Sequence, residues 1–200
     1  MTWHSMLAFV AIIPAAATFY FFIFWRWFDF WRKHRVLTFL TLIGSAVAVA
    51  VVVGGPGGWA LAKRIRFPAA VQIVGWFLVA LATVFGTIAD RQIGLRVRSF
   101  MPFFDEHGRI ELKTTGAYGV VRHPIYAAGS GIQLGAFLVT GYPAVFVAWA
   151  VFTLGALWFT RQEERRLIVL LDDPSEYDRY RQRVPALFPR IRRLRPRRST

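Results

Sequence analysis

The sequence predicts an all-α integral membrane protein with about five transmembrane helices, including a C-terminal helical hairpin that is followed by a cytoplasmic helical tail. Hydrophobic residues make up 56% of the 200-residue chain and its mean hydropathy is +0.41, which is too apolar for a water-soluble globule. Several charge-free runs approach or exceed the roughly 20 residues that a spanning helix needs. Basic residues also gather in alternate connecting segments, as they do in multi-pass membrane proteins.

Three charge-free runs lie in the first half of the chain. Residues 5–25 form the first, which we interpret as one retained helix and not as a cleaved signal peptide, because neither Lys nor Arg precedes it. The second run covers residues 36–53 and stops at a Gly- and Pro-rich turn signal, residues 54–58. The third covers residues 67–89.

A longer run, residues 124–160, contains no Asp, Glu, Lys or Arg and is too long for one ordinary span. Gly141-Tyr142-Pro143 interrupts it near the middle and predicts a tight hairpin with arms of about 17 residues. Small residues recur along the first arm. They would allow another helix or a flat ligand to approach the backbone of this arm closely.

The distribution of charge orients the five spans. With the N-terminus outside, the cytoplasmic segments 26–35, 90–122 and 161–200 hold 22 of the 25 basic residues and all 11 acidic residues. The outer loop, residues 54–66, holds the other three basic residues. Since short cytoplasmic loops are enriched in Lys and Arg, we expect a multi-pass protein of the cytoplasmic (inner) membrane whose C-terminus is in the cytoplasm.

The cytoplasmic segments contain most of the polar residues. Residues 90–122 are too often interrupted by Gly and Pro to form one long helix. Residues 161–183 are expected to form two short amphipathic helices separated at Asp172-Asp173-Pro174, and by composition the second is a surface helix. The Arg-rich tail, residues 190–198, is expected to bind anionic lipid headgroups and not nucleic acid.

Composition limits the chemistry that such a protein can perform. The chain has no cysteine, which excludes disulfides, thiolate metal sites and cysteine nucleophiles. Asp105-Glu106-His107 does not match a usual metal-ligand spacing, so we expect no metal site.

One candidate site lies where the connector enters the fourth span. Arg122, His123 and Tyr126 surround Pro124, and together they would direct a cation, an imidazole and a phenol into one cytoplasm-facing pocket. Taken singly, each has an ordinary alternative explanation as a flanking or interfacial residue of a membrane helix.

A second group, Arg161, Glu163 and Glu164, lies at the cytoplasmic end of the fifth span. A hairpin would bring it beside the first group, because the start of the first arm and the end of the second arm lie at the same membrane interface. One carboxylate could face the pocket while the other pairs with Arg161, Arg165 or Arg122, since adjacent helical residues point about 100° apart. Taken alone, such a pair is usually solvated charge.

Several motifs occur in a fixed order over about residues 113–190. They are Gly116-x-Tyr118, Arg122-His123-Pro124-x-Tyr126, Glu163-Glu164-x-x-Leu167, Glu176-Tyr177-x-x-Tyr180 and Val184-Pro185. This order resembles the isoprenylcysteine carboxyl methyltransferase family and the related phospholipid N-methyltransferases. The chain departs from the family at Gly116-Ala117-Tyr118, where Gly-Pro-Tyr is frequent.

The resemblance implies a membrane enzyme that uses S-adenosylmethionine. Its acceptor would be lipophilic or membrane-associated: an isoprenylcysteine-like carboxylate, a lipid amine or a thiol. Residues 1–89 would form an N-terminal three-helix membrane region and residues 90–200 the cofactor-binding catalytic region.

The resemblance also implies roles for individual residues. His123, Pro124 and Tyr126 would line the cofactor pocket, with Glu163 and Glu164 as its acidic part. Given this cofactor, further roles follow from charge and ring chemistry. Tyr118 would add an aromatic face, Arg122 or Arg161 would pair with the cofactor's carboxylate, and Glu163, Glu164 or His123 would accept a proton from an amine acceptor.

Two other classes of protein remain open at this point. Membrane reductases of the sterol-reductase type use NADPH and share the Arg-His-Pro-x-Tyr motif, but they typically carry Asn where this chain has Ile125. The Glu163-Glu164 pair favours the methyltransferase. The third class is a non-catalytic membrane scaffold, and the cofactor that binds, if any, distinguishes the three.

Overall fold

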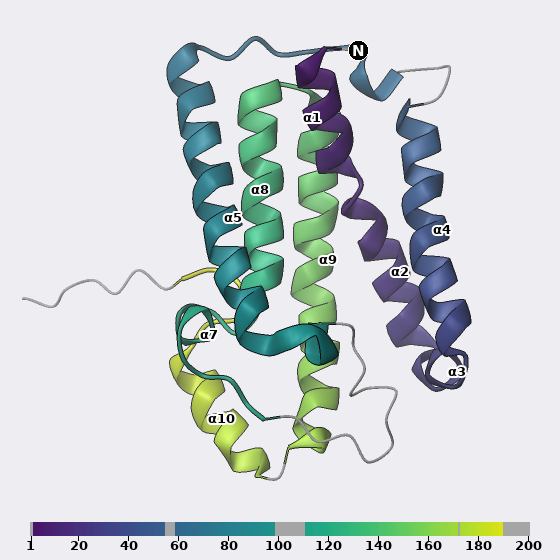
Figure 1. The fold of residues 1–200 in the computed structure, drawn as a ribbon, viewed down its shortest axis with the longest axis vertical. Coiled ribbons are helices and arrows are strands. Elements are labelled where there is room, and N and C mark those ends of the chain that lie inside the picture. The colour runs from purple at the N-terminus through teal and green to yellow at the C-terminus, as the bar shows by residue number, and fades with distance from the viewer. Residues whose placement is uncertain (1, 55–58, 99–110, 172, 190–200) are drawn as a thin grey trace, which may run out of the picture.

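The computed structural model describes residues 2–54, 59–98, 111–171 and 173–189, and in these ranges every regular element is a helix (Figure 1). Within these described ranges, three segments are long and apolar enough to cross a membrane: Arg35–Val53, Ala69–Gly94 and Pro143–Leu170. The prediction of an all-α, membrane-type fold is therefore confirmed, while the number of five spans stays a prediction.

The first apolar run is not one helix, which corrects the sequence prediction. It forms α1 (Trp3–Ile12) and α2 (Ala15–Arg26), and Pro14 lies between them. Proline lacks an N–H group and its ring collides with the carbonyl one turn earlier, so an α-helix does not continue regularly through it. Near the break, the carbonyl of Ala11 accepts a 2.9 Å hydrogen bond from the buried side chain of Gln133. A short α3 (Phe28–Lys33) follows.

The next two apolar runs form helices close to the predicted bounds. They are α4 (Arg35–Gly54) and α5 (Ala69–Arg98), and the 3-10 turn η1 (Trp59–Leu61) lies between them. Helix α5 continues beyond residue 89, so the first part of the connector is helical. Gly94, with a φ of 70°, interrupts it there.

The predicted hairpin is confirmed as α8 (Pro124–Thr140) and α9 (Pro143–Leu167). Gly141 has a φ of 72° and ends α8 in the left-handed conformation that glycine adopts readily. Its carbonyl accepts a 2.8 Å hydrogen bond from the N–H of Ile65, and Arg64 Nε donates at 2.7 Å to the carbonyl of Thr140. The loop before α5 therefore holds the turn of the hairpin.

The segments predicted to be cytoplasmic differ from the prediction in one respect. The first of the two short amphipathic helices expected over residues 161–183 is instead the continuation of α9, which runs to Leu167 and into the 3-10 turn η2 (Ile168–Leu170), because its sequence contains no break until Asp172-Asp173-Pro174. The second is present as α10 (Pro174–Arg183), capped by the Asp173 side chain. The Arg-rich tail lies outside the described residues.

Small residues allow α5 and α8 to pack backbone against backbone. This pair forms the most extensive helix contact among the described elements. A Cβ atom on Gly135 would lie 2.7 Å from the carbonyl oxygen of Gly75, and one on Gly131 would lie 2.9 Å from the Cβ of Ala82. Close approach at small residues is a common way for membrane helices to associate. The small-residue stripe of the first arm therefore serves helix packing.

We predict that Gly135→Ala destabilises the protein by about 1–3 kcal/mol, because the added methyl group would force α5 and α8 apart. Thermal unfolding of the detergent-purified protein measures this effect. Gly44→Ala on α4 is the control, since a Cβ there meets no atom within 4 Å and alanine favours the helix. Equal melting temperatures for the two variants would contradict this account of the packing.

Candidate functional site

Residues from both ends of the hairpin meet at the end of the molecule opposite the N-terminus. The lower end of α9, the short helix α7 (Ala117–Val120) and α10 all lie there (Figure 1). Arg122 and His123 directly precede α8, and Glu163 and Glu164 lie in the last turns of α9. The predicted proximity of the two groups across the hairpin is therefore present.

Glu164 is the centre of this group. Its Oε1 atom accepts hydrogen bonds from Arg122 Nε at 3.0 Å and His123 Nε2 at 2.8 Å, and it lies 2.9 Å from Arg122 Nη2. The Arg122, His123 and Glu164 side chains are only 8–9% exposed. Of the three arginines proposed as partners for the glutamate pair, Arg122 is the one that binds Glu164. A buried carboxylate with several charged donors forms a strong and directional contact.

Arg122 also binds the segment that follows α10. Its Nη1 atom donates to the carbonyl of Val184 and, at 3.2 Å, to that of Arg181. The backbone N–H groups of Arg122 and His123 donate to the carbonyls of Pro185 and Ala186, at 2.8 and 3.0 Å. The C-terminal segment is thus joined to the loop before α8 through both side-chain and backbone hydrogen bonds.

Two tyrosines of α10 complete this junction. Tyr177 and Tyr180 are buried, and the Tyr180 hydroxyl donates a 2.6 Å hydrogen bond to the carbonyl of Tyr118 on α7. Burial raises the pKa of both phenols, and it also raises that of Tyr118, where the nearby Glu163 charge adds to the effect. All three hydroxyls therefore stay protonated at neutral pH and can donate.

Composition alone had suggested that α10 is a surface helix. Tyr177, Tyr180 and Val184 are buried together, and Leu167 and Leu171 pack against them. The signal that composition missed is the spacing of these three residues, which places them on one face of a helix whose other positions are mostly charged.

Glu163 differs from its neighbour because no arginine in the described part of the chain pairs with its carboxylate. Its side chain is 22% exposed, and its Oε2 atom is buried without a hydrogen-bond partner in the described part of the chain. His123 Nδ1 lies 3.9 Å from this Oε2 atom, and the Tyr126 phenol is the other polar group that interacts with the Glu163 carboxyl. A buried carboxylate oxygen without a donor is costly, so Glu163 is suited to receive one from a ligand.

Aromatic rings line the same side of the site. The Tyr126 ring lies 6.0 Å from that of His123 and 4.8 Å from that of Phe159, and Phe21 on α2 reaches it at 6.1 Å. Arg122 pairs with Glu164, so its charge does not neutralise the Glu163 carboxyl group beside these rings. Carboxylate and aromatic faces around an unpartnered oxygen favour a cationic ligand.

The other two predicted site residues, Pro124 and Arg161, lie on the two helices of the hairpin. Pro124 is buried and begins α8, and Arg161 is exposed on α9. The roles of the predicted site residues and the division at residue 89 stay predictions. In the described ranges there is no group of three or more His, Cys, Asp or Glu residues that could hold a metal ion, and Asp105-Glu106-His107 lies outside those ranges.

Fold and site together define a helical membrane protein with a buried polar site at the open end of a hairpin. A family model described as phospholipid methyltransferase matches residues 70–170, from α5 through the hairpin to η2. The chain belongs to this family, which includes proteins like isoprenylcysteine carboxyl methyltransferase, and it is a membrane methyltransferase. No curated protein and no solved structure matched the chain.

We predict that Glu164→Gln and Arg122→Met each lower the melting temperature by roughly 10 °C, because breaking a buried ion pair costs about 3–5 kcal/mol. Thermal unfolding of both single variants and of the double variant measures their coupling. The double variant should lose much less than the sum of the single losses. Arg165→Gln, on the exposed side of α9, is the control, and additive losses would contradict the pairing.

Proposed function

We propose that this membrane methyltransferase takes its methyl group from S-adenosylmethionine and transfers it to a lipophilic or membrane-associated acceptor. The observation that carries the proposal is the buried Glu163 carboxyl group beside His123 and Tyr126, whose Oε2 atom has no hydrogen-bond partner within the geometric limits of a hydrogen bond. The family match supports the reaction class, and the polar group supports a cationic cofactor at this position.

The residues of the site fit such a cofactor in charge and shape. Glu163 and the aromatic rings of Tyr126 and Tyr118 would face its positively charged groups. Pro124 would fix the start of α8, and with it the direction of these rings. Because Arg122 is committed to Glu164 and to the C-terminal segment, Arg161 is the better candidate to pair with the cofactor's carboxylate.

When bound, the cofactor would supply a sulfonium methyl group for in-line displacement by the acceptor's electron pair, with the thioether S-adenosylhomocysteine as the leaving group. The protein's task is then to align two molecules and to exclude water. An acceptor that is a carboxylate or a thiolate requires no base. An amine acceptor loses one proton, and Glu163 is the carboxylate available to take it, with His123 second, since Glu164 is engaged by Arg122.

We further propose that the site faces the cytoplasm and that the protein resides in the inner membrane with its N-terminus outside. The charge asymmetry of the loops supports this orientation. The acceptor would reach the site from the bilayer, between helices, and the cofactor from the cytoplasm. Bilayer lipids with anionic headgroups would hold the Arg-rich tail, and nucleic acid is not a proposed partner.

We predict that S-adenosylhomocysteine binds the detergent-purified protein with micromolar affinity and that Glu163→Gln weakens this binding about 10- to 100-fold, as expected for a hydrogen bond to a charged group. Isothermal titration calorimetry measures the binding, with NADPH titrated in parallel. Glu111→Gln, at a carboxylate that is 80% exposed, is the matched control.

The three classes of protein give different results in this experiment. Binding of S-adenosylhomocysteine alone supports the methyltransferase. Binding of NADPH alone would indicate a membrane reductase. Binding of neither ligand, by a protein with a normal melting transition, would favour a non-catalytic scaffold. Unchanged affinity of Glu163→Gln for S-adenosylhomocysteine would show that Glu163 does not contact the cofactor, although the protein still binds it.

A further inference from the structure

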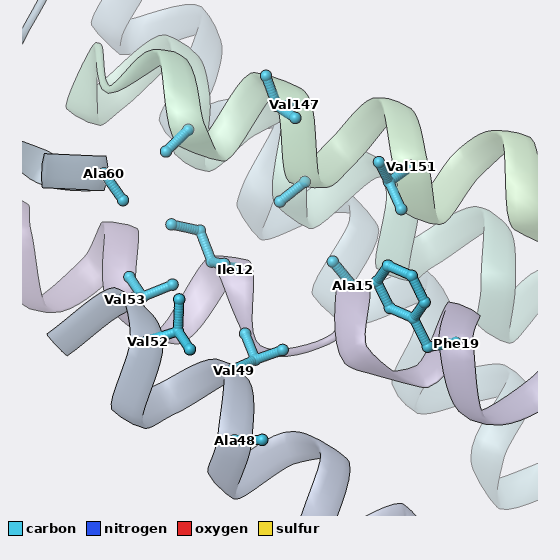
Figure 2. A pocket seen from close by; sticks show the side chains of 12 residues that line it. Ile12, Ala15, Phe19, Ala48, Val49, Val52, Val53, Ala60, Val147 and Val151 are labelled. Atoms are coloured by element: carbon cyan, nitrogen blue, oxygen red, sulfur yellow. The ribbon is translucent and has the colours of Figure 1, made fainter. Parts of the chain in front are cut away.

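A second feature of the molecule lies far from the polar site. An apolar groove of about 400 Å³ runs between the α1–α2 break, α4 and α9, and all 12 residues that line it are Ala, Val, Ile or Phe (Figure 2). Its lining therefore offers no polar side chain to a ligand. A space of this size is within the range of small-molecule binding sites, which is about 300–1,000 Å³.

The groove exists because the first apolar run is broken. Helix α1 packs mainly against α8 and α9 and only slightly against α4, whereas α2 packs extensively against both α4 and α9. Ile12 and Ala15, on either side of the break, form the wall between the two flanking helices (Figure 2). Alanines on the facing helices, Ala48 on α4 and Ala144 and Ala148 on α9, leave the space between them unfilled.

Close packing of α2 on α9 separates the groove from the polar site. A Cβ atom on Gly155 would collide with Thr18, so the two helices touch directly just past the groove. Beyond this contact, the rings of Phe21 and Phe159 lie 4.8 Å apart. Val151, at the near end of the groove, is about 20 Å along α9 from Glu164.

The groove is continuous with the surface that the helices turn to the bilayer. Phe19, Val52 and Val147 line it and are also 64%, 59% and 59% exposed. Helices α4 and α9 are both apolar enough to cross a membrane, so the medium outside this rim is lipid. Water has no polar partner in such a space, and a hydrocarbon chain fits both its chemistry and its opening.

We propose that this groove binds one hydrocarbon chain of a bilayer lipid, in the half of the membrane away from Glu164. The chain fills the space between α2, α4 and α9 and thereby holds α4 against the rest of the bundle. The stabilisation would come from van der Waals packing and not from the hydrophobic effect, because the bilayer that the lipid chain leaves is as apolar as the groove that it enters. This site is separate from the acceptor site of the proposed methyl transfer and does not depend on it.

Photo-crosslinking in lipid nanodiscs tests the proposal directly. The probe is a phosphatidylcholine with a diazirine in the middle of one acyl chain, and peptide mass spectrometry locates the label. We expect several-fold more label on the groove residues of α4 and α9 than on the exposed face of α5 around Leu81. Equal labelling of both faces would show ordinary contact with bulk lipid and would overturn the proposal.

Two variants fill the groove from opposite walls, so the test survives if one of them fails to fold. Ala144→Phe on α9 and Ala48→Phe on α4 should each lower groove labelling several-fold, whereas Leu81→Phe on α5 should leave it unchanged. The melting temperature in detergent should rise on adding phosphatidylcholine to the wild type and rise less in the filled variants. Labelling that survives in a folded filled variant would contradict the site.

Discussion

The buried ion pair between Arg122 and Glu164 connects three parts of the chain that are distant in sequence. Glu164 fixes the end of α9, Arg122 fixes the loop before α8, and the same guanidinium holds the backbone of residues 181–184. A buried charge without its partner is strongly destabilising, so these three segments are held together or released together. The site is therefore a junction in which this ion pair joins all three segments, and the backbone hydrogen bonds from Arg122 and His123 add to it.

This ion pair also gives the two adjacent glutamates different hydrogen-bond partners. Glu164 is engaged by Arg122 and His123, whereas the Oε2 atom of Glu163 is buried without a hydrogen-bond partner. The membrane framework makes this arrangement possible. Close packing of α8 on α5 and the tight turn at Gly141 return α9 to the interface where α8 began, so residues 41 or 42 positions apart meet.

Patterns that depend on composition and spacing predicted the helical class, the hairpin and the meeting of its two polar ends. They succeeded because charge-free length, a Gly-Tyr-Pro turn and the return of a hairpin to its starting interface are local or topological properties. The break at Pro14 was missed, since hydropathy alone does not register a lost backbone donor. The choice of Arg122 among three candidate partners of Glu164 depends on tertiary contacts, which one sequence does not reveal. By contrast, the buried face of α10 was missed although the spacing of Tyr177, Tyr180 and Val184 indicated it.

Hydrogen–deuterium exchange with mass spectrometry tests the junction most directly. The backbone N–H groups of Arg122 and His123 donate to carbonyls of residues 185 and 186, so exchange there reports whether the C-terminal segment is docked. In Glu164→Gln, we expect faster exchange in residues 117–123 and in residues 177–187 together, with α4 and α5 unchanged. Wild-type protection of both segments in that variant would contradict the central role of the ion pair.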